Sequence, residues 1–296
     1  LFMVAANERN SEEKDYLLVD KLIEDYGIGG LIYFQSSPQR HVSLVNRFQR
    51  KSSLPLMNGI DGEWGLAMRI DSLEPYPWNM TLGAITNDSL IFQMGQALAL
   101  ECQAMGIHFN FAPVVDVNSN PFNPIINMRS YGESVLEVSK KGLALMNGMQ
   151  DAGVLACAKH FPGHGDTESD SHKMLPLISH DRASIDSIDL PPFKQLIDRG
   201  VASVMVAHLN IPSIDSTKNR ASTLSPAIVD SLLVQELNFK GLIFTDALNM
   251  KGVSSFYNSG RLEVEALRAG NDVLLFSEDI PAAFEAILVA IEDSVL

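Results

Sequence analysis

The stretch GLIFTDALNMKGVSSFYNSGRLEVEALRAGNDVLLF, residues 241–276, decides the fold prediction. It begins with the short apolar run GLIFT, continues with a segment of helical period over residues 262–269, and returns to a second apolar run, DVLLF. Short runs that are apolar throughout are typical of parallel strands buried on both faces. The stretch therefore predicts a strand, a helix and a second parallel strand.

The same alternation continues over the rest of the chain. The predicted strands cover residues 1–6, 30–34, 55–60, 108–113, 154–160, 201–208, 241–245 and 272–276. The predicted helices cover residues 12–26, 39–50, 89–105, 135–151, 182–199, 226–238, 262–269 and 282–291. Eight predicted strands, each followed by a predicted helix, indicate an α/β fold: a single (β/α)8 TIM-type barrel. The alternative is an open doubly wound sheet, but the first loop, ANERNSEEK, carries no GxGxxG fingerprint.

The length of 296 residues allows one or two domains at about 150 residues each, or one barrel of about 250. No low-complexity stretch or linker marks an internal boundary, so we expect one domain over residues 1–296. The chain begins at Leu1, and LFMVAA already has the pattern of a strand. We therefore expect residues upstream to have been removed or omitted, which leaves the compartment open between the cytoplasm and export.

The charge balance argues against a nucleic-acid partner. The chain has 22 Lys and Arg against 36 Asp and Glu, a net charge of −14, which disfavours a phosphate backbone. No apolar run is long enough to predict a membrane span. The two cysteines, Cys102 and Cys157, stand in apolar surroundings and are predicted to be buried free thiols.

Polar residues directly after apolar strands are candidate site residues, because active sites of such barrels form at the carboxyl ends of the strands. Asp61, Lys159, His160, His208 and Asp246 stand at such positions. Two loops are also longer than usual and are expected to carry function. They cover residues 114–134, which include Arg129, and residues 161–181.

The second long loop lies in KHFPGHGDTESDSHKMLP, residues 159–176, and allows two chemical interpretations. A metal site could use His160, His164, Asp166 and His172, but the spacing matches neither HExxH nor the Cys/His zinc frameworks. We favour an acid/base pair in which the Asp170 carboxylate orients the His172 ring. His164 and Asp166, taken singly, are better explained as cross-links of the loop and stay outside the catalytic set.

Five motifs in order along the chain carry a family resemblance. They are IDGEWGLAMR (60–69), FAPVVDVNSNP (111–121), MRSYGE (128–133), KHFPGHGDTESDSH (159–172) and FTDALNMKG (244–252). Together they resemble the β-N-acetylglucosaminidase branch of glycoside hydrolase family 3. The resemblance implies a barrel enzyme that releases terminal β-linked N-acetylglucosamine with retention, through a covalent glycosyl-enzyme and without a metal or cofactor. By analogy, the carbohydrate substrates would include peptidoglycan fragments.

The resemblance also implies a role for each matching residue. Asp246 would be the nucleophile, although an Asp at this position could instead cap the following helix. His172, oriented by Asp170, would be the acid/base. The predicted sugar-binding residues are Asp61, Arg69, Arg129, Lys159 and His160. A structural role is expected for His208, and because adjacent strand residues alternate in direction, His160 could instead be buried in the wall.

The chain departs from the family at DGEWGLAMR, where many relatives have a DQEGGRVQR type of stretch. Trp64 and Leu66 are therefore expected to change the mouth of the site, and Trp64 and Met68 to form an apolar rim. Some relatives carry a further domain, so the gene product is expected to continue beyond Leu296.

Three rival interpretations remain open. A family 3 β-glucosidase or β-xylosidase usually takes its acid/base from a second domain, and the DSH segment argues against it. A metal-dependent hydrolase would lose activity with a chelator. A non-catalytic sugar-binding barrel would show no turnover at all. The oligomeric state is not predicted.

Overall fold

The computed structural model describes residues 1–6, 12–167, 175–258 and 260–296. Its parallel strands are β1 (Phe2–Ala6), β2 (Gly30–Tyr33), β3 (Met57–Ile60), β4 (Phe109–Asn110), β5 (Leu155–Phe161), β6 (Ser203–Val206), β7 (Leu242–Thr245) and β8 (Leu274–Leu275). They form one sheet in the order β7-β6-β5-β4-β3-β2-β1-β8. A parallel bridge between Phe244 and Val273 joins the two ends of this sheet. The predicted (β/α)8 barrel is thereby confirmed.

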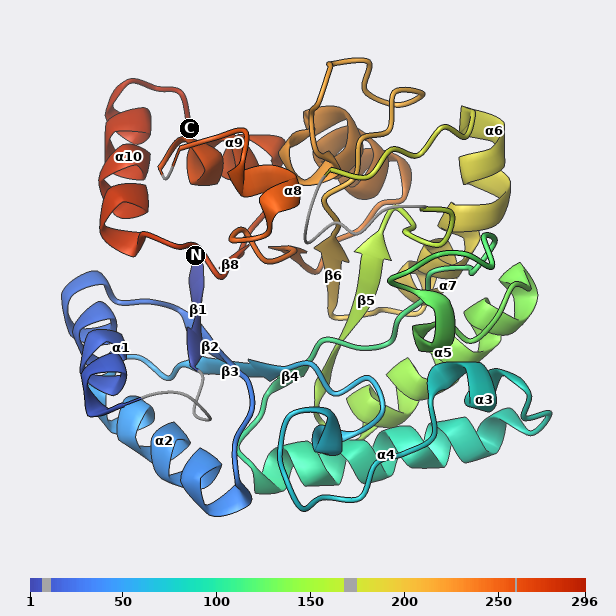
Figure 1. The fold of residues 1–296 in the computed structure, drawn as a ribbon, viewed down its shortest axis with the longest axis horizontal. Coiled ribbons are helices and arrows are strands. Elements are labelled where there is room, and N and C mark those ends of the chain that lie inside the picture. The colour runs from blue at the N-terminus through green and yellow to red at the C-terminus, as the bar shows by residue number, and fades with distance from the viewer. Residues whose placement is uncertain (7–11, 168–174, 259) are drawn as a thin grey trace.

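Helices surround the ring of strands (Figure 1). The α-helices are α1 (Glu13–Tyr26), α2 (Pro38–Lys51), α3 (Asn79–Gly83), α4 (Asp88–Ala104), α5 (Val135–Asp151), α6 (Arg182–Ser184), α7 (Leu190–Asp198), α8 (Lys251–Ser254), α9 (Arg261–Ala269) and α10 (Ile280–Glu292). Short 3-10 turns are η1 (Leu66–Met68), η2 (Asn127–Arg129) and η4 (Ser222–Leu224), and π-helical segments are η3 (Ile185–Asp189) and η5 (Ala227–Glu236). Helices α4 and α5 approach closely at two glycines: a Cβ on Gly148 would lie 2.1 Å from the Phe92 carbonyl oxygen, and one on Gly95 would lie 2.6 Å from that of Leu145.

The barrel interior is filled by side chains from the strands. This inner cluster consists of Met3, Ile32, Phe109, Phe111, Cys157, Met205, Phe244 and Leu275. The Phe244 ring meets those of Phe109 and Phe111 edge to face, each at 5.3 Å between centroids, a favourable aromatic geometry. A filled lumen closes the barrel below its carboxyl-terminal mouth and leaves the chemistry to that mouth.

Cys102 and Cys157 are buried free thiols, as predicted. None of the helices in the described ranges is long and apolar enough to cross a membrane.

Some element boundaries differ from the sequence prediction. The predicted helix over residues 226–238 is mostly the π-helix η5, and the one over 182–199 passes through the π-segment η3. Pro191 and Pro192 follow η3, and neither has an N–H to donate to the preceding turn. The predicted strand over 108–113 is regular only at Phe109–Asn110: the Phe111 N–H still donates to the Ile60 carbonyl of β3 at 2.8 Å, but the Ala112 N–H turns back to the Asn110 carbonyl at 2.8 Å.

Candidate active site

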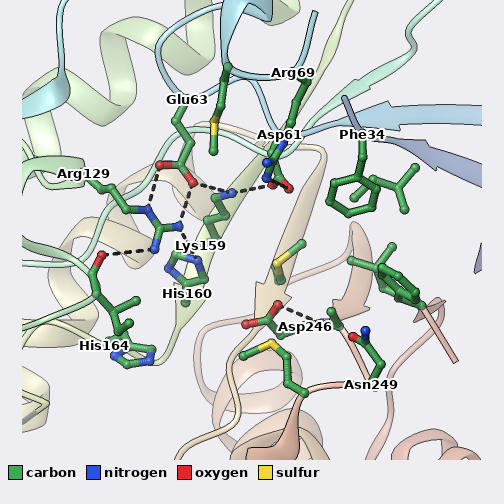
Figure 2. Close-up of a pocket in the computed structure, with 18 residues that line it drawn as sticks. Phe34, Asp61, Glu63, Arg69, Arg129, Lys159, His160, His164, Asp246 and Asn249 are labelled. Atoms are coloured by element: carbon green, nitrogen blue, oxygen red, sulfur yellow. Dashed lines mark hydrogen bonds and ion pairs between the residues drawn. The ribbon is translucent and has the colours of Figure 1, made fainter. Parts of the chain in front are cut away.

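A pocket of about 320 Å³ opens at the carboxyl ends of the strands (Figure 2). Its wall is built from residues in or after β2, β3, β5, β6, β7 and β8, with two more from the long loop after β4. The structure brings to this one pocket Asp246 and every predicted sugar-binding residue: Asp61, Arg69, Arg129, Lys159 and His160.

One side of the pocket is a network of paired charges. The Lys159 Nζ lies 2.8 Å from Asp61 Oδ1 and 2.8 Å from Glu63 Oε1. Arg69 Nη2 donates to Asp61 Oδ2 at 2.9 Å. Arg129 donates two hydrogen bonds to Glu63, from Nε to Oε2 at 2.9 Å and from Nη2 to Oε1 at 2.7 Å. We call Asp61, Glu63, Arg69, Arg129 and Lys159 the charged network.

Within the charged network, each charged side chain favours the ionised form of its partners. Burial alone would raise the pKa of Asp61, but the charges of Lys159 and Arg69 outweigh it and hold the pKa below its usual value. Glu63, unlike the partly exposed Asp61, is fully buried, which alone would raise its pKa, but Arg129 and Lys159 hold the pKa of its carboxyl far below the usual range. Burial would lower the pKa of Lys159, yet its two carboxylate partners raise it. The network therefore stays charged at neutral pH before any substrate arrives.

His160 is held in one orientation by Asp116, a fully buried carboxylate. Asp116 Oδ2 lies 2.7 Å from His160 Nδ1, and its carboxylate also accepts the main-chain N–H groups of His160 and His164. On the other side of the ring, Arg129 Nη2 lies 3.2 Å from His160 Nε2. A ring that donates from Nδ1 and accepts at Nε2 satisfies both contacts.

Lys159 and His160 are neighbours in β5, yet both line the pocket. The pairing of β5 with β6 shifts in register between Ala158 and Phe161. The simple alternation of strand side chains does not hold across such an irregularity. His160 is thus largely buried, as the alternative interpretation expected, and it also lines the pocket.

Asp246 follows β7 directly and faces the pocket across from the charged network (Figure 2). Its Oδ1 accepts the Ala247 N–H at 2.8 Å. Burial opposes ionisation of Asp246, but His208, His160 and this N–H together lower its pKa. The next helix, α8, has Met250 as its N-cap, so Asp246 does not cap it. Asp246 is thus an ionised carboxylate that is open to a ligand.

The predicted acid/base residues Asp170 and His172 lie outside the described residues. On either side of them the loop is cross-linked. His180 Nε2 pairs with Asp166 Oδ2 at 2.7 Å, and the buried His164 Nδ1 contacts the Thr167 hydroxyl at 2.7 Å. The expectation that His164 and Asp166 hold the loop together agrees with these contacts.

Within the described ranges, no three His, Cys, Asp or Glu side chains are grouped as a metal site requires. One residue of the rival metal set, His172, lies outside those ranges. His208 is fully buried and hydrogen-bonds the Thr223 hydroxyl at 2.7 Å and the Ala247 carbonyl at 3.0 Å. Its position agrees with the structural role expected from the sequence, because it supports the loop that follows Asp246.

The rim differs in two respects from the sequence prediction. Met68 lines the pocket, but Trp64 is not among the lining residues, and its ring lies against that of Trp78 at 4.0 Å between centroids and 35° between planes. Leu66, however, does not reach the mouth: η1 turns its side chain into the hydrophobic core, where it is fully buried. The expectation for Leu66 was wrong.

Sequence reasoning missed Glu63 and Asp116, although both stand in the quoted motifs. A carboxylate inside an apolar stretch such as FAPVVDV signals a buried group that needs partners. Apart from Met68, it also missed the uncharged residues of the pocket, above all Phe34, Asn249 and Phe276.

The sequence profile described as the glycosyl hydrolase family 3 N terminal domain matches residues 3–295. The chain belongs to glycosyl hydrolase family 3. The prediction of a glycoside hydrolase is thereby confirmed at the level of the family, and the resemblance stated from the motifs is correct.

Individual relatives agree with the family. The chain is 40% identical to beta-hexosaminidase A of Pseudoalteromonas piscicida over 280 residues, 87% of this chain and 47% of the relative. It is 34% identical to a beta-hexosaminidase of Thiobacillus denitrificans over 265 residues, 86% of this chain and 72% of the relative. A family 3 beta-N-acetylglucosaminidase structure from a Paenibacillus species superposes with a TM-score of 0.92 at 38% identity, covering 99% of this chain and 57% of that one. The chain thus spans about half the length of the first and third of these relatives.

Proposed function

We propose that residues 1–296 form the catalytic barrel of a retaining exo-β-N-acetylglucosaminidase. The observation that carries the proposal is the position of Asp246, an ionised carboxylate facing the charged network across a pocket of about 320 Å³. Vicinal sugar hydroxyls suit charged donors and acceptors held in fixed geometry. The names of the two curated relatives and of the Paenibacillus structure support N-acetylhexosamine as the substrate.

In the first step, an Asp246 carboxylate oxygen bonds to the anomeric carbon as the bond to the leaving oxygen breaks. His172, with its charge supported by Asp170, gives its proton to that oxygen. In the second step, His172 takes a proton from water, and the resulting hydroxide displaces Asp246 from the anomeric carbon. Two inversions at one carbon give net retention, and the acid/base residue ends in its starting state.

The test compares aryl β-N-acetylglucosaminide with aryl β-glucoside in the wild type, Asp246→Asn and His172→Ala, with and without a chelator. We expect the wild type to prefer the N-acetylated substrate and to be insensitive to the chelator. Asp246→Asn should lose roughly a thousandfold or more in kcat, and His172→Ala roughly 100- to 10,000-fold. Azide should partly restore the His172→Ala enzyme by replacing water in the second step.

The outcomes separate the rival functions. Preference for the glucoside would favour a β-glucosidase, and loss of activity with the chelator would favour a metal-dependent hydrolase. Complete inactivity of the folded wild type would favour a sugar-binding barrel.

The proposed natural substrates are peptidoglycan fragments that end in β-linked N-acetylglucosamine. Incubation with purified fragments should release free N-acetylglucosamine, measured by chromatography, faster than incubation with chitobiose at the same concentration. Faster release from chitobiose would move the proposal to chitin fragments.

A further inference from the structure

The chain has two tryptophans, Trp64 and Trp78, and they lie against each other at the surface, with 4.0 Å between ring centroids and 35° between planes. Trp78 is 39% exposed, and Trp64 is half-buried. Neither is part of a hydrophobic core cluster of the described residues. Large aromatic side chains that pair at the surface instead of joining the core are typical of a binding surface.

Both tryptophans stand on the face of the barrel that carries the pocket. They lie in the segment after β3, and the segments after the strands of such a barrel gather at its carboxyl-terminal face. Trp64 directly follows Glu63, which lines the pocket. Trp78 directly precedes Asn79, whose Nδ2 donates to the Arg129 carbonyl at 2.6 Å. The pair therefore lies outside the pocket but next to residues that build its charged network.

The main chain holds the two rings in place before any ligand binds. The Trp64 carbonyl accepts the Tyr76 N–H at 3.0 Å, which joins the two ends of the segment. Gly65 makes this approach possible, since a Cβ there would lie 2.6 Å from Tyr76 Cδ2. The Trp78 carbonyl accepts the Thr81 N–H at 2.9 Å, at the start of α3. A surface that is already ordered loses little conformational entropy on binding.

The chemistry of the pair fits a neutral saccharide. The C–H groups on one face of a β-linked pyranose ring leave water when that face stacks on an indole ring. In the described part of the chain, no protein group accepts the N–H of either indole, so each can donate to a sugar hydroxyl. Nucleic acid bases also stack on tryptophan, but the net charge of −14 disfavours their phosphates.

We propose that Trp64 and Trp78 form a stacking platform that binds a sugar unit of the glycan outside the pocket, while the terminal sugar occupies the pocket. The proposal rests on the proposed function, because it takes the substrate to be a glycan whose terminal sugar lies there. Trp64 stands in DGEWGLAMR, at a position where the DQEGGRVQR type of stretch has glycine. The platform is therefore a departure from that pattern, and it makes longer glycans better substrates.

The first experiment compares kcat/KM of the wild type and Trp78→Ala for two substrates. One is β-N-acetylglucosaminyl fluoride, which has no sugar beyond the terminal one, and the other is the β-1,4-linked tetrasaccharide of N-acetylglucosamine. We expect roughly a tenfold loss for the tetrasaccharide and less than about a twofold change for the fluoride, because only the tetrasaccharide reaches the platform. Trp78→Phe keeps an aromatic face and should recover part of the loss.

The matched control is Leu100→Ala, which removes a large exposed apolar side chain from α4. It should leave kcat/KM unchanged for both substrates. Equal losses for the two substrates in Trp78→Ala, or no loss with either, overturn the platform.

A second measurement needs no turnover. Because Trp64 and Trp78 are the two tryptophans of the chain, tryptophan fluorescence reports on the platform directly. In Asp246→Asn, which slows hydrolysis, saturation with the tetrasaccharide should change the emission much more than saturation with N-acetylglucosamine. An emission that the tetrasaccharide leaves unchanged, or that both ligands change equally, overturns the platform.

Two other outcomes have their own meaning. If Trp78→Ala converts a dimer to a monomer in sedimentation and keeps the preference for the tetrasaccharide, the pair is a contact between copies of the chain and the platform is overturned. Failure of the proposed function is distinguishable, because it is read from the wild type. A wild type that prefers β-glucosyl fluoride overturns both proposals, whereas a failure seen only in Trp78→Ala overturns this one alone.

Discussion

The two walls of the pocket differ in how they are held before a substrate binds. On the charged wall, formed by the charged network, every ionised group is already paired, with Lys159 between Asp61 and Glu63 and Arg129 on Glu63. The uncharged lining residues, which we call the uncharged wall, include Phe34, Asn249 and Phe276 and carry no ionised side chain. The charged wall is therefore fixed by its own ion pairs, whereas the uncharged wall offers mainly apolar contacts. Predictions that remove one feature at a time test this division.

The largest expected effect comes from removing a charge from the charged wall. Glu63→Gln keeps the shape but leaves Arg129 and Lys159 without their shared carboxylate. Breaking a buried ion pair from one side costs roughly 3–5 kcal/mol, so urea unfolding should show a loss of that order, with a raised KM. The matched control is Glu24→Gln, an exposed partner of the exposed Lys51, which should cost less than about 1 kcal/mol. Equal losses in the two variants would contradict the account.

His164, which lines the pocket near the charged wall, should make stability depend on pH. Burial, followed by the influence of His160, lowers the pKa of His164 to about 4 in the folded protein, from 6.5. Below pH 6.5 the unfolded chain binds a proton that the folded one does not, so stability falls as pH falls towards 4. The full effect is about 3 kcal/mol. Urea unfolding at several pH values should show it in the wild type, and His164→Asn should lack this component; an unchanged pH slope would contradict it.

Substitution of Asp116 tests whether the fixed orientation of the His160 ring contributes to turnover. In Asp116→Asn, an amide NH2 replaces an oxygen that accepts from the ring or from main-chain N–H groups. Loss of a charged hydrogen bond costs roughly 1.5–3 kcal/mol, so kcat/KM should fall roughly 10- to 100-fold. Asp198→Asn, at an exposed helical ion pair with Lys194, is the control and should have no effect on turnover. Full activity of Asp116→Asn would show that the orientation of His160 is set elsewhere.

The smallest expected effect comes from substituting Phe34, an uncharged pocket residue that contacts Arg69 of the charged wall. The Arg69 guanidinium carbon lies 5.1 Å from the centroid of the Phe34 ring. Phe34→Leu keeps the apolar surface but removes the cation–π contact, worth roughly 0.5–1 kcal/mol, so KM should rise about two- to fivefold. Phe256→Leu, at an exposed ring, should leave KM unchanged. A larger change in kcat than in KM would mean that Phe34 acts on the reaction step instead.

Most of the barrel, but not every element in it, could be predicted from the sequence. The barrel was predictable because runs such as GLIFT are apolar throughout and alternate with helical segments. The short β4 and the π-helix η5 were not, because local hydrogen bonds such as Ala112 N–H to the Asn110 carbonyl override the apolar pattern.

On the charged wall, Asp61 and Lys159 were predictable because polar groups stand out at the ends of apolar strands, whereas Arg69 was predicted only from the family resemblance. Glu63 was not singled out, since its two cations come from segments far along the chain that only folding brings together. On the uncharged wall, Phe34 and Phe276 have the same apolar pattern as strand residues, so nothing in the sequence separates them from the core.

Covalent trapping tests the central claim most directly. A 5-fluoro N-acetylglucosaminyl fluoride forms the glycosyl-enzyme but slows its breakdown, because the fluorine destabilises an oxocarbenium-like transition state. Mass spectrometry of the intact protein should show one added fluorinated N-acetylglucosaminyl group per chain, and peptide mapping should locate it on Asp246. Attachment to another residue, or turnover of aryl β-N-acetylglucosaminide without any trapped adduct, would contradict the account.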